Sequence, residues 1–100
     1  MRRITYGGTV FLTGDRIAHA LAVYARALAR RGLADIVQVP ARSSGGAVGS
    51  IEMLVGPAAQ LVSEPWDDVE LELEDDDRVA EWERLAAELE DSRPVGDSTH

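Results

Sequence analysis

The chain has 100 residues, 45% of them hydrophobic, and a formal net charge of −8 at pH 7. This length and composition suit a single globular domain whose core needs neither a metal nor a crosslink. Because there is no cysteine, disulfides, thiolate metal sites and thiol catalysis are excluded.

The first predicted elements are a short strand and a long amphipathic helix. Residues 9–12 are β-prone, and residues 4–6 extend this strand if the two glycines between them form a bulge or a turn. Residues 13–32 have an apolar stripe at helical spacing. The stripe consists of Ile17, Leu21, Tyr24 and Leu28. We expect Thr13 to cap this helix and Gly32 to end it.

A second strand is predicted at residues 35–39, where Pro40 stops it. Strand, helix and strand in close succession are typical of a βαβ unit, so we expect the two strands to lie parallel with a right-handed crossover. Residues 41–50 read as a loop rich in glycine and serine. Residues 50–55 and 59–64 flank Gly56-Pro57-Ala58, which predicts a β-hairpin.

The acidic C-terminal half predicts one more strand and a second helix. Val69, Leu71 and Leu73 alternate with Glu70 and Glu72, as in a half-buried strand with an acidic face. A helix should follow from about Asp76 to about Glu90, with an apolar stripe on one side. The stripe consists of Val79, Trp82, Leu85, Ala86 and Leu89. We expect the aspartates before it to cap the helix rather than bind a metal.

These elements predict a two-layer α/β (α+β) domain at residues 1–91, followed by a flexible tail at residues 92–100. A mixed sheet of four or five strands should carry both helices on one face, in the order β-α-β-β-β-β-α. The expected core is apolar: Val10, Leu12, Ile17, Leu21, Tyr24, Leu28, Val37, Val39, Ile51, Met53, Val55, Leu61, Leu71, Leu73, Val79, Trp82, Leu85 and Leu89. Ile36, Leu54 and Val62 alternate onto the uncovered sheet face, which would mark an interface.

One candidate ligand site joins the glycine-rich loop to the start of the first helix. Its residues are Arg42, Ser43, Ser44, Gly45, Gly46, Thr13 and Arg16. An arginine, hydroxyl groups and unhindered backbone N–H groups can together hold an anion. The glycine spacing fits no nucleotide-binding motif, and the chain has no phosphate-loop lysine. An ordinary flexible loop beside a capped helix is the competing interpretation.

The inventory of catalytic residues is thin and disfavours an enzyme. The two histidines are His19, on the predicted outer face of the first helix, and His100 at the end of the chain. Without cysteine or lysine, thiol nucleophiles, Schiff bases and most zinc chemistry are closed. We expect no cofactor and no metal.

Charge is distributed unevenly along the chain. Residues 1–50 carry seven arginines and two acids, a balance of +5, whereas residues 51–100 carry three arginines and sixteen acids, a balance of −13. The overall charge disfavours nucleic acid as a partner. It favours contact between the two halves, within one chain or between two protomers. The residues expected at such an interface are Arg16, Arg26, Arg30, Glu70 and Glu72.

We therefore expect a small, non-enzymatic protein-interaction or regulatory domain that self-associates, with a homodimer as the simplest form. The absence of any apolar run near ~20 residues indicates a cytoplasmic protein with no membrane contact. Arginine as the sole basic side chain beside histidine favours a bacterial origin. One alternative is a small-ligand or anion-binding protein, or an enzyme, that uses residues 42–46 and 13–16. Another is an acidic inhibitor of a basic protein.

Overall fold

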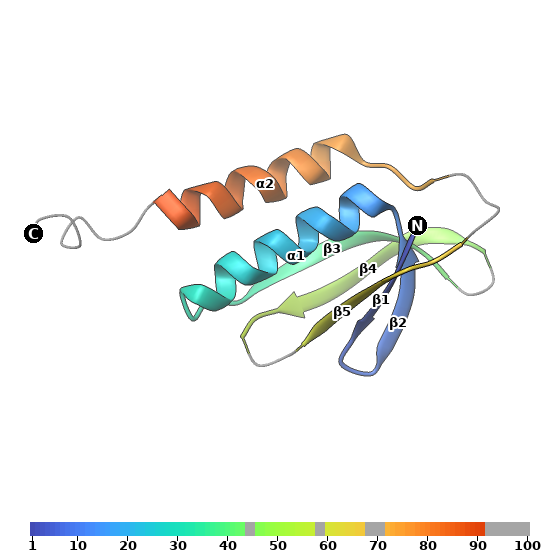
Figure 1. The fold of residues 1–100 in the computed structure, drawn as a ribbon, viewed down its shortest axis with the longest axis horizontal. Helices are drawn as coiled ribbons and strands as arrows, with labels where there is room; N and C mark the ends of the chain where they lie inside the picture. Colours follow the sequence, from blue (N-terminus) through green and yellow to red (C-terminus); the bar gives the residue numbers. More distant parts are fainter. Residues whose placement is uncertain (44–45, 58–59, 68–71, 92–100) are drawn as a thin grey trace, which may run out of the picture.

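The computed structural model describes residues 1–43, 46–57, 60–67 and 72–91. These form a five-stranded sheet with two helices on one side of it (Figure 1), so the predicted two-layer fold class is confirmed. The elements in order are β1 (Arg2–Tyr6), β2 (Thr9–Thr13), α1 (Asp15–Arg30), β3 (Asp35–Arg42), β4 (Val48–Val55), β5 (Leu61–Pro65) and α2 (Asp76–Asp91). The predicted tail at 92–100 and part of the predicted acidic strand, residues 69–71, lie outside the described residues.

The strands are ordered β4-β3-β2-β1-β5, and the pairings among the described residues are all antiparallel. The predicted parallel pairing across α1 is wrong. Leu12 and Arg42 are the register pair between β2 and β3 among the described residues, whereas β3 pairs with β4 along its whole length, from Asp35 to Arg42. Pro40 does not stop β3, which runs on to Arg42, and Pro40 pairs in register with Ser50.

The predicted hairpin between the fourth and fifth strands is also wrong. β4 pairs with β3, whereas β5 pairs with β1 at the opposite edge of the sheet. The glycine-proline signal marks a reversal of the chain but does not specify which strands will pair. The described end of the predicted acidic strand, Glu72 and Leu73, is not in a strand.

The sheet curves, so that its two edge strands approach each other at one end. β4 ends at Val55 and β5 begins at Leu61, although the two strands lie at opposite edges. At this end the Tyr6 hydroxyl of β1 donates a 2.7 Å hydrogen bond to the Leu54 carbonyl of β4. The helices therefore lie on the concave side of the sheet (Figure 1).

The β1–β2 hairpin fixes which side chains face the helices. Gly7 has a φ of 60° in its turn, a conformation that glycine adopts without strain. The register places Ile4 opposite Phe11, and both are buried. Val10 is therefore exposed, contrary to the predicted core, because neighbouring strand residues face opposite sides.

The two helices begin and end largely at the predicted residues. Gly32 (φ 67°) ends α1, with the Leu33 N–H bonded to the Leu28 carbonyl at 2.9 Å, as in a Schellman motif. Asp75 caps α2 by accepting a 3.0 Å hydrogen bond from the Arg78 N–H, so capping by the acidic run is confirmed. Thr13 does not cap α1, whose N-cap is Gly14.

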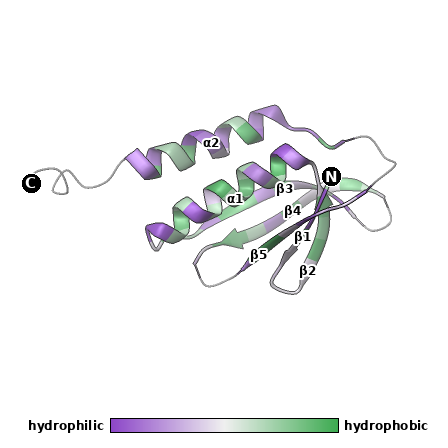
Figure 2. Cartoon of the chain, viewed as in Figure 1, coloured by the Kyte–Doolittle hydropathy of each residue, from purple (hydrophilic) through white to green (hydrophobic). Residues whose placement is uncertain are grey.

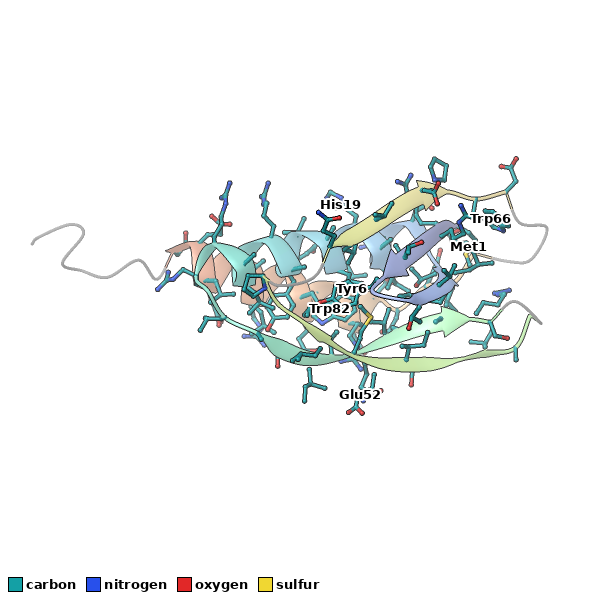
Figure 3. All side chains as sticks on the ribbon, turned by 90° about the horizontal axis from the view of Figure 1, so that it is seen from below. Met1, Tyr6, His19, Glu52, Trp66 and Trp82 are labelled. Atoms are coloured by element: carbon teal, nitrogen blue, oxygen red, sulfur yellow. The ribbon has the colours of Figure 1, made fainter. Side chains whose placement is uncertain are left out.

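The core lies between the sheet and the two helices. The predicted stripe of α1 is buried, and Trp82 of α2 is the largest fully buried side chain (Figure 3). Figure 2 shows the alternation of apolar and polar residues along both helices. Neither helix is long and apolar enough to cross a membrane among the residues described.

Candidate interaction surface

The structure brings together only part of the sequence-predicted ligand site. Thr13 and Arg42 lie on adjoining strands, because β2 and β3 meet at Leu12 and Arg42. The Thr13 hydroxyl donates a 2.7 Å hydrogen bond to the Pro40 carbonyl, and Arg42 is a buried residue. Arg16 contacts α2 instead. Thr13 and Arg16 thus have partners within the chain.

The loop of the predicted ligand site is closed by its own backbone. The Ser43 N–H donates to the Ala47 carbonyl, and the Gly46 N–H donates to the Ser43 carbonyl, both at 2.9 Å. Ser44 and Gly45 lie outside the described residues. Anion binding by this loop stays a prediction.

The predicted charged interface has its contacts mainly inside one chain. Arg16 Nη1 lies 2.8 Å from Asp76, and Arg30 Nη1 lies 3.5 Å from Glu90, so these two arginines of α1 pair with acids of α2. Exposed pairs of this kind contribute only about 0–1 kcal/mol each. Arg26 is exposed, and Glu70 lies outside the described residues.

Glu72 closes the start of α1 from a distant part of the sequence. Its carboxylate accepts a 2.5 Å hydrogen bond from the Asp15 N–H, which supplies the cap that Gly14 lacks. The Met1 ammonium lies 3.0 Å from both Asp15 and Glu72. Burial lowers the pKa of this ammonium, but the hydrogen bonds to the two carboxylates outweigh burial and raise the pKa above its ordinary 8.0.

The convex face of the sheet, turned away from the helices, exposes large apolar side chains. We call this set the outer face, and it consists of Val10, Ile36, Val48, Leu54 and Val62. The predicted exposure of Ile36, Leu54 and Val62 is confirmed. The exposure of Val48 was not predicted. Val48, Ser50, Glu52 and Leu54 are every second residue of β4, so they lie on the same face of the sheet.

The free edge of β4 adjoins the outer face. β4 is eight residues long and lies at the end of the strand order. Within the described residues its strand partner is β3, which leaves the other edge open. The strand contains no proline, and its one charged residue, Glu52, projects outward from the β3–β4 hairpin (Figure 3). β5, the other edge strand, is shorter and ends in Pro65.

Metal-binding groups and the surroundings of His19 are the two features of the described residues that bear on chemistry by titratable side chains. No group of three histidine, aspartate or glutamate side chains in the described ranges is placed to hold a metal. His19 is exposed and lines a small cavity with Arg2, Asp15 and Ser63. Arg2 donates to both the hydroxyl and the carbonyl of Ser63 at 2.9 Å, which fixes this pair structurally. His100 lies outside the described residues.

Comparison with protein-family models, with curated protein sequences and with solved structures found no match.

Proposed function

We propose that this chain is a non-enzymatic interaction domain that forms a homodimer by pairing its β4 strand with β4 of a second copy. The observation that supports this proposal best is the open edge of β4, with Val48 and Leu54 each 60% exposed beside it. An edge strand presents unpaired N–H and C=O groups that template another strand. β4 lacks the proline, the lysines and the short length that normally blunt such an edge.

A two-fold axis through Ile51 gives the most favourable register for this pairing. Two-fold symmetry keeps both copies of the outer face on the same side of the joined sheet. In this register Val48 lies opposite Leu54 of the second copy, and Ser50 lies opposite Glu52. Apolar side chains therefore meet apolar ones, and the carboxylate meets a hydroxyl.

The neighbouring registers are worse on the same criterion. An axis through Ser50 would place Val48 opposite Glu52, so a carboxylate would lie against an apolar side chain. An axis through Glu52 would set the two Glu52 carboxylates against each other. The Leu54 carbonyl already accepts from Tyr6, but a carbonyl oxygen has a second lone pair that can accept a strand bond.

The expected dimer dissociates on dilution. Burying Val48 and Leu54 of both copies contributes about 1.5–3 kcal/mol for each side chain. Association costs about 4–15 kcal/mol in lost translational and rotational freedom. The free energy gained by burial and the cost of association are similar in size, so the dimer should be weak. The average mass in solution should therefore rise with protein concentration.

Sedimentation velocity over a range of concentrations tests the proposal. The natural chain should shift from monomer to dimer as concentration rises, and Leu54→Lys should remain a monomer because it places two cations in an apolar interface. Val62→Lys adds the same charge on the outer face at the other edge of the sheet and should still dimerise. Pairing through β4 would be refuted if the natural chain stayed a monomer at every concentration. It would also be refuted if Val62→Lys reduced dimer formation as much as Leu54→Lys.

A further inference from the structure

A cleft lies where the C-terminal halves of the two helices meet the segment before β3. Its volume is about 700 Å³, within the range of sites that hold small organic molecules. Residues from α1, from the segment before β3 and from α2 line it. Because three separate elements build this cleft, its walls are held by the core of the fold.

The walls of the cleft are mainly leucine side chains. Leu28 of α1 is buried, Leu85 and Leu89 of α2 are partly buried, and Leu33 at the cleft is 47% exposed. The ring of Tyr24 adds a further apolar surface. An apolar group of a ligand could pack against these partly exposed leucines and be removed from water, which would favour binding.

The charged groups that line the cleft are all acidic. They are Asp35, Glu88 and Asp91. Tyr24 donates a 2.5 Å hydrogen bond to Asp35 Oδ2, and an ionised carboxylate can accept further bonds on both oxygens. The C-terminal end of α2 adds the negative end of its dipole, and no basic residue lies in its last turn.

Nearby arginines offset this negative charge only in part. Arg84 pairs with Glu88 at 2.9 Å along α2, and Arg31 donates to the Leu89 carbonyl at 2.8 Å. Arg30 lies 3.5 Å from Glu90. None of these arginines lines the cleft. Asp35 faces the leucine walls and is placed to receive a cation.

We infer that this cleft binds a small apolar molecule carrying one positive charge, such as an alkylammonium or arylammonium ion. The ammonium group would bond to the Asp35 carboxylate, and the hydrocarbon would lie against Leu33, Leu85 and Leu89. This inference does not rest on dimer formation, because the cleft and the β4 edge share no residues.

Three probes of equal length and different charge test the inference: n-hexylammonium, 1-hexanol and hexanoate. Each is titrated into the full chain and followed by amide chemical shifts in two-dimensional NMR. Hexylammonium should give saturable shifts at Leu33, Leu85 and Leu89, with affinity roughly tenfold above hexanol and hexanoate weakest of the three. No saturable shift, shifts centred elsewhere, or equal affinities for the three probes would overturn the inference.

Leu33→Lys provides the matching variant, because it places a cation at an exposed position on the cleft. It should weaken hexylammonium binding about tenfold and strengthen hexanoate binding. Val62→Lys is the control, because Val62 is 48% exposed, Leu33 is 47% exposed, and Val62 does not line the cleft. It should change the affinity for neither hexylammonium nor hexanoate. Equal effects of the two variants, or no effect of Leu33→Lys, would contradict binding at this cleft.

Discussion

Gly14 lies directly against the backbone carbonyl of Leu73, so closely that a side-chain carbon at Gly14 would overlap the Leu73 oxygen. This contact joins the turn between β2 and α1 to the segment that leads into α2. Glu72, the neighbour of Leu73, bonds to the Asp15 N–H at the same place. The acidic segment thus closes the start of α1, which explains why α1 needs no local side-chain cap.

Gly14→Ala should destabilise the protein, because the added carbon forces the 72–73 segment off the helix. Overpacking of this kind costs about 1–3 kcal/mol in unfolding free energy. Urea denaturation followed by circular dichroism measures the change. Gly8→Ala is the control, because Gly8 has open space around it and no positive φ. Equal stabilities of the two variants would argue against the close contact.

Stability should fall as pH rises above 8. The folded chain holds a proton on Met1 that the unfolded chain loses above pH 8.0, since contacts with Asp15 and Glu72 raise the folded pKa. The contribution is complete below pH 8 and is lost as pH passes the raised pKa. With no lysine and no cysteine in the chain, few other groups titrate between pH 8 and 10.

Urea unfolding at intervals from pH 7 to 10 measures this slope. Acetylation of the α-amino group should remove it. Above pH 10.0 a further loss should come from Tyr24, whose pKa is raised by burial and by its hydrogen bond to Asp35. Tyr24→Phe should remove only that second loss. A stability that is flat or rising from pH 8 to 10 would contradict the Met1 contacts.

Trp82→Ala should destabilise the fold far more than Trp66→Ala. Trp82 is 1% exposed and Trp66 is 41% exposed. Truncating a buried tryptophan costs about 3–5 kcal/mol. Trp66 packs under the Arg3 guanidinium, 4.9 Å from its ring centre, and an exposed contact of this kind contributes about 0.5–1 kcal/mol. Chemical denaturation of both variants measures the difference, and similar losses would mean that α2 does not pack into the core.

Replacing Arg16 and Arg30 by glutamine should leave the mass of the protein in solution unchanged. These arginines pair with Asp76 and Glu90 of their own chain, so they are not needed to attract a second copy. The double variant should lose no more than about 2 kcal/mol of stability, since both pairs are exposed. Sedimentation at low salt is the measurement. Conversion of a dimer to a monomer would instead favour self-association through charge.

Structural features that depend on residues close together in the sequence could be predicted. The stripe from Ile17 to Leu28, the end of α1 at Gly32 and the capping of α2 by acids each depend on local geometry, and each was predicted. The uncovered side chains of Ile36 and Leu54 could also be predicted, because alternation along a strand is local.

Features decided by distant partners could not be predicted. Residues 61–65 are β-prone in any pairing, and packing of the whole fold selects β1 as their neighbour instead of β4. The face on which Val10 lies depends on the register between β1 and β2. Because Phe11, and not Val10, lies opposite Ile4, Phe11 takes the place in the core that was predicted for Val10. The cap supplied by Glu72 has no local sequence signal, because the two segments meet only in the folded chain.

Charge exchange across the proposed β4 pairing tests the central claim most directly. The dissociation constant is measured by sedimentation for Val48→Glu, for Leu54→Lys and for the double variant. Each single change should weaken the dimer at least about tenfold, because a charge would face an apolar side chain twice in the interface. The double variant should regain much of this loss, since glutamate and lysine then lie opposite each other. Losses that simply add, or a dimer unaffected by either change, would contradict the proposed register.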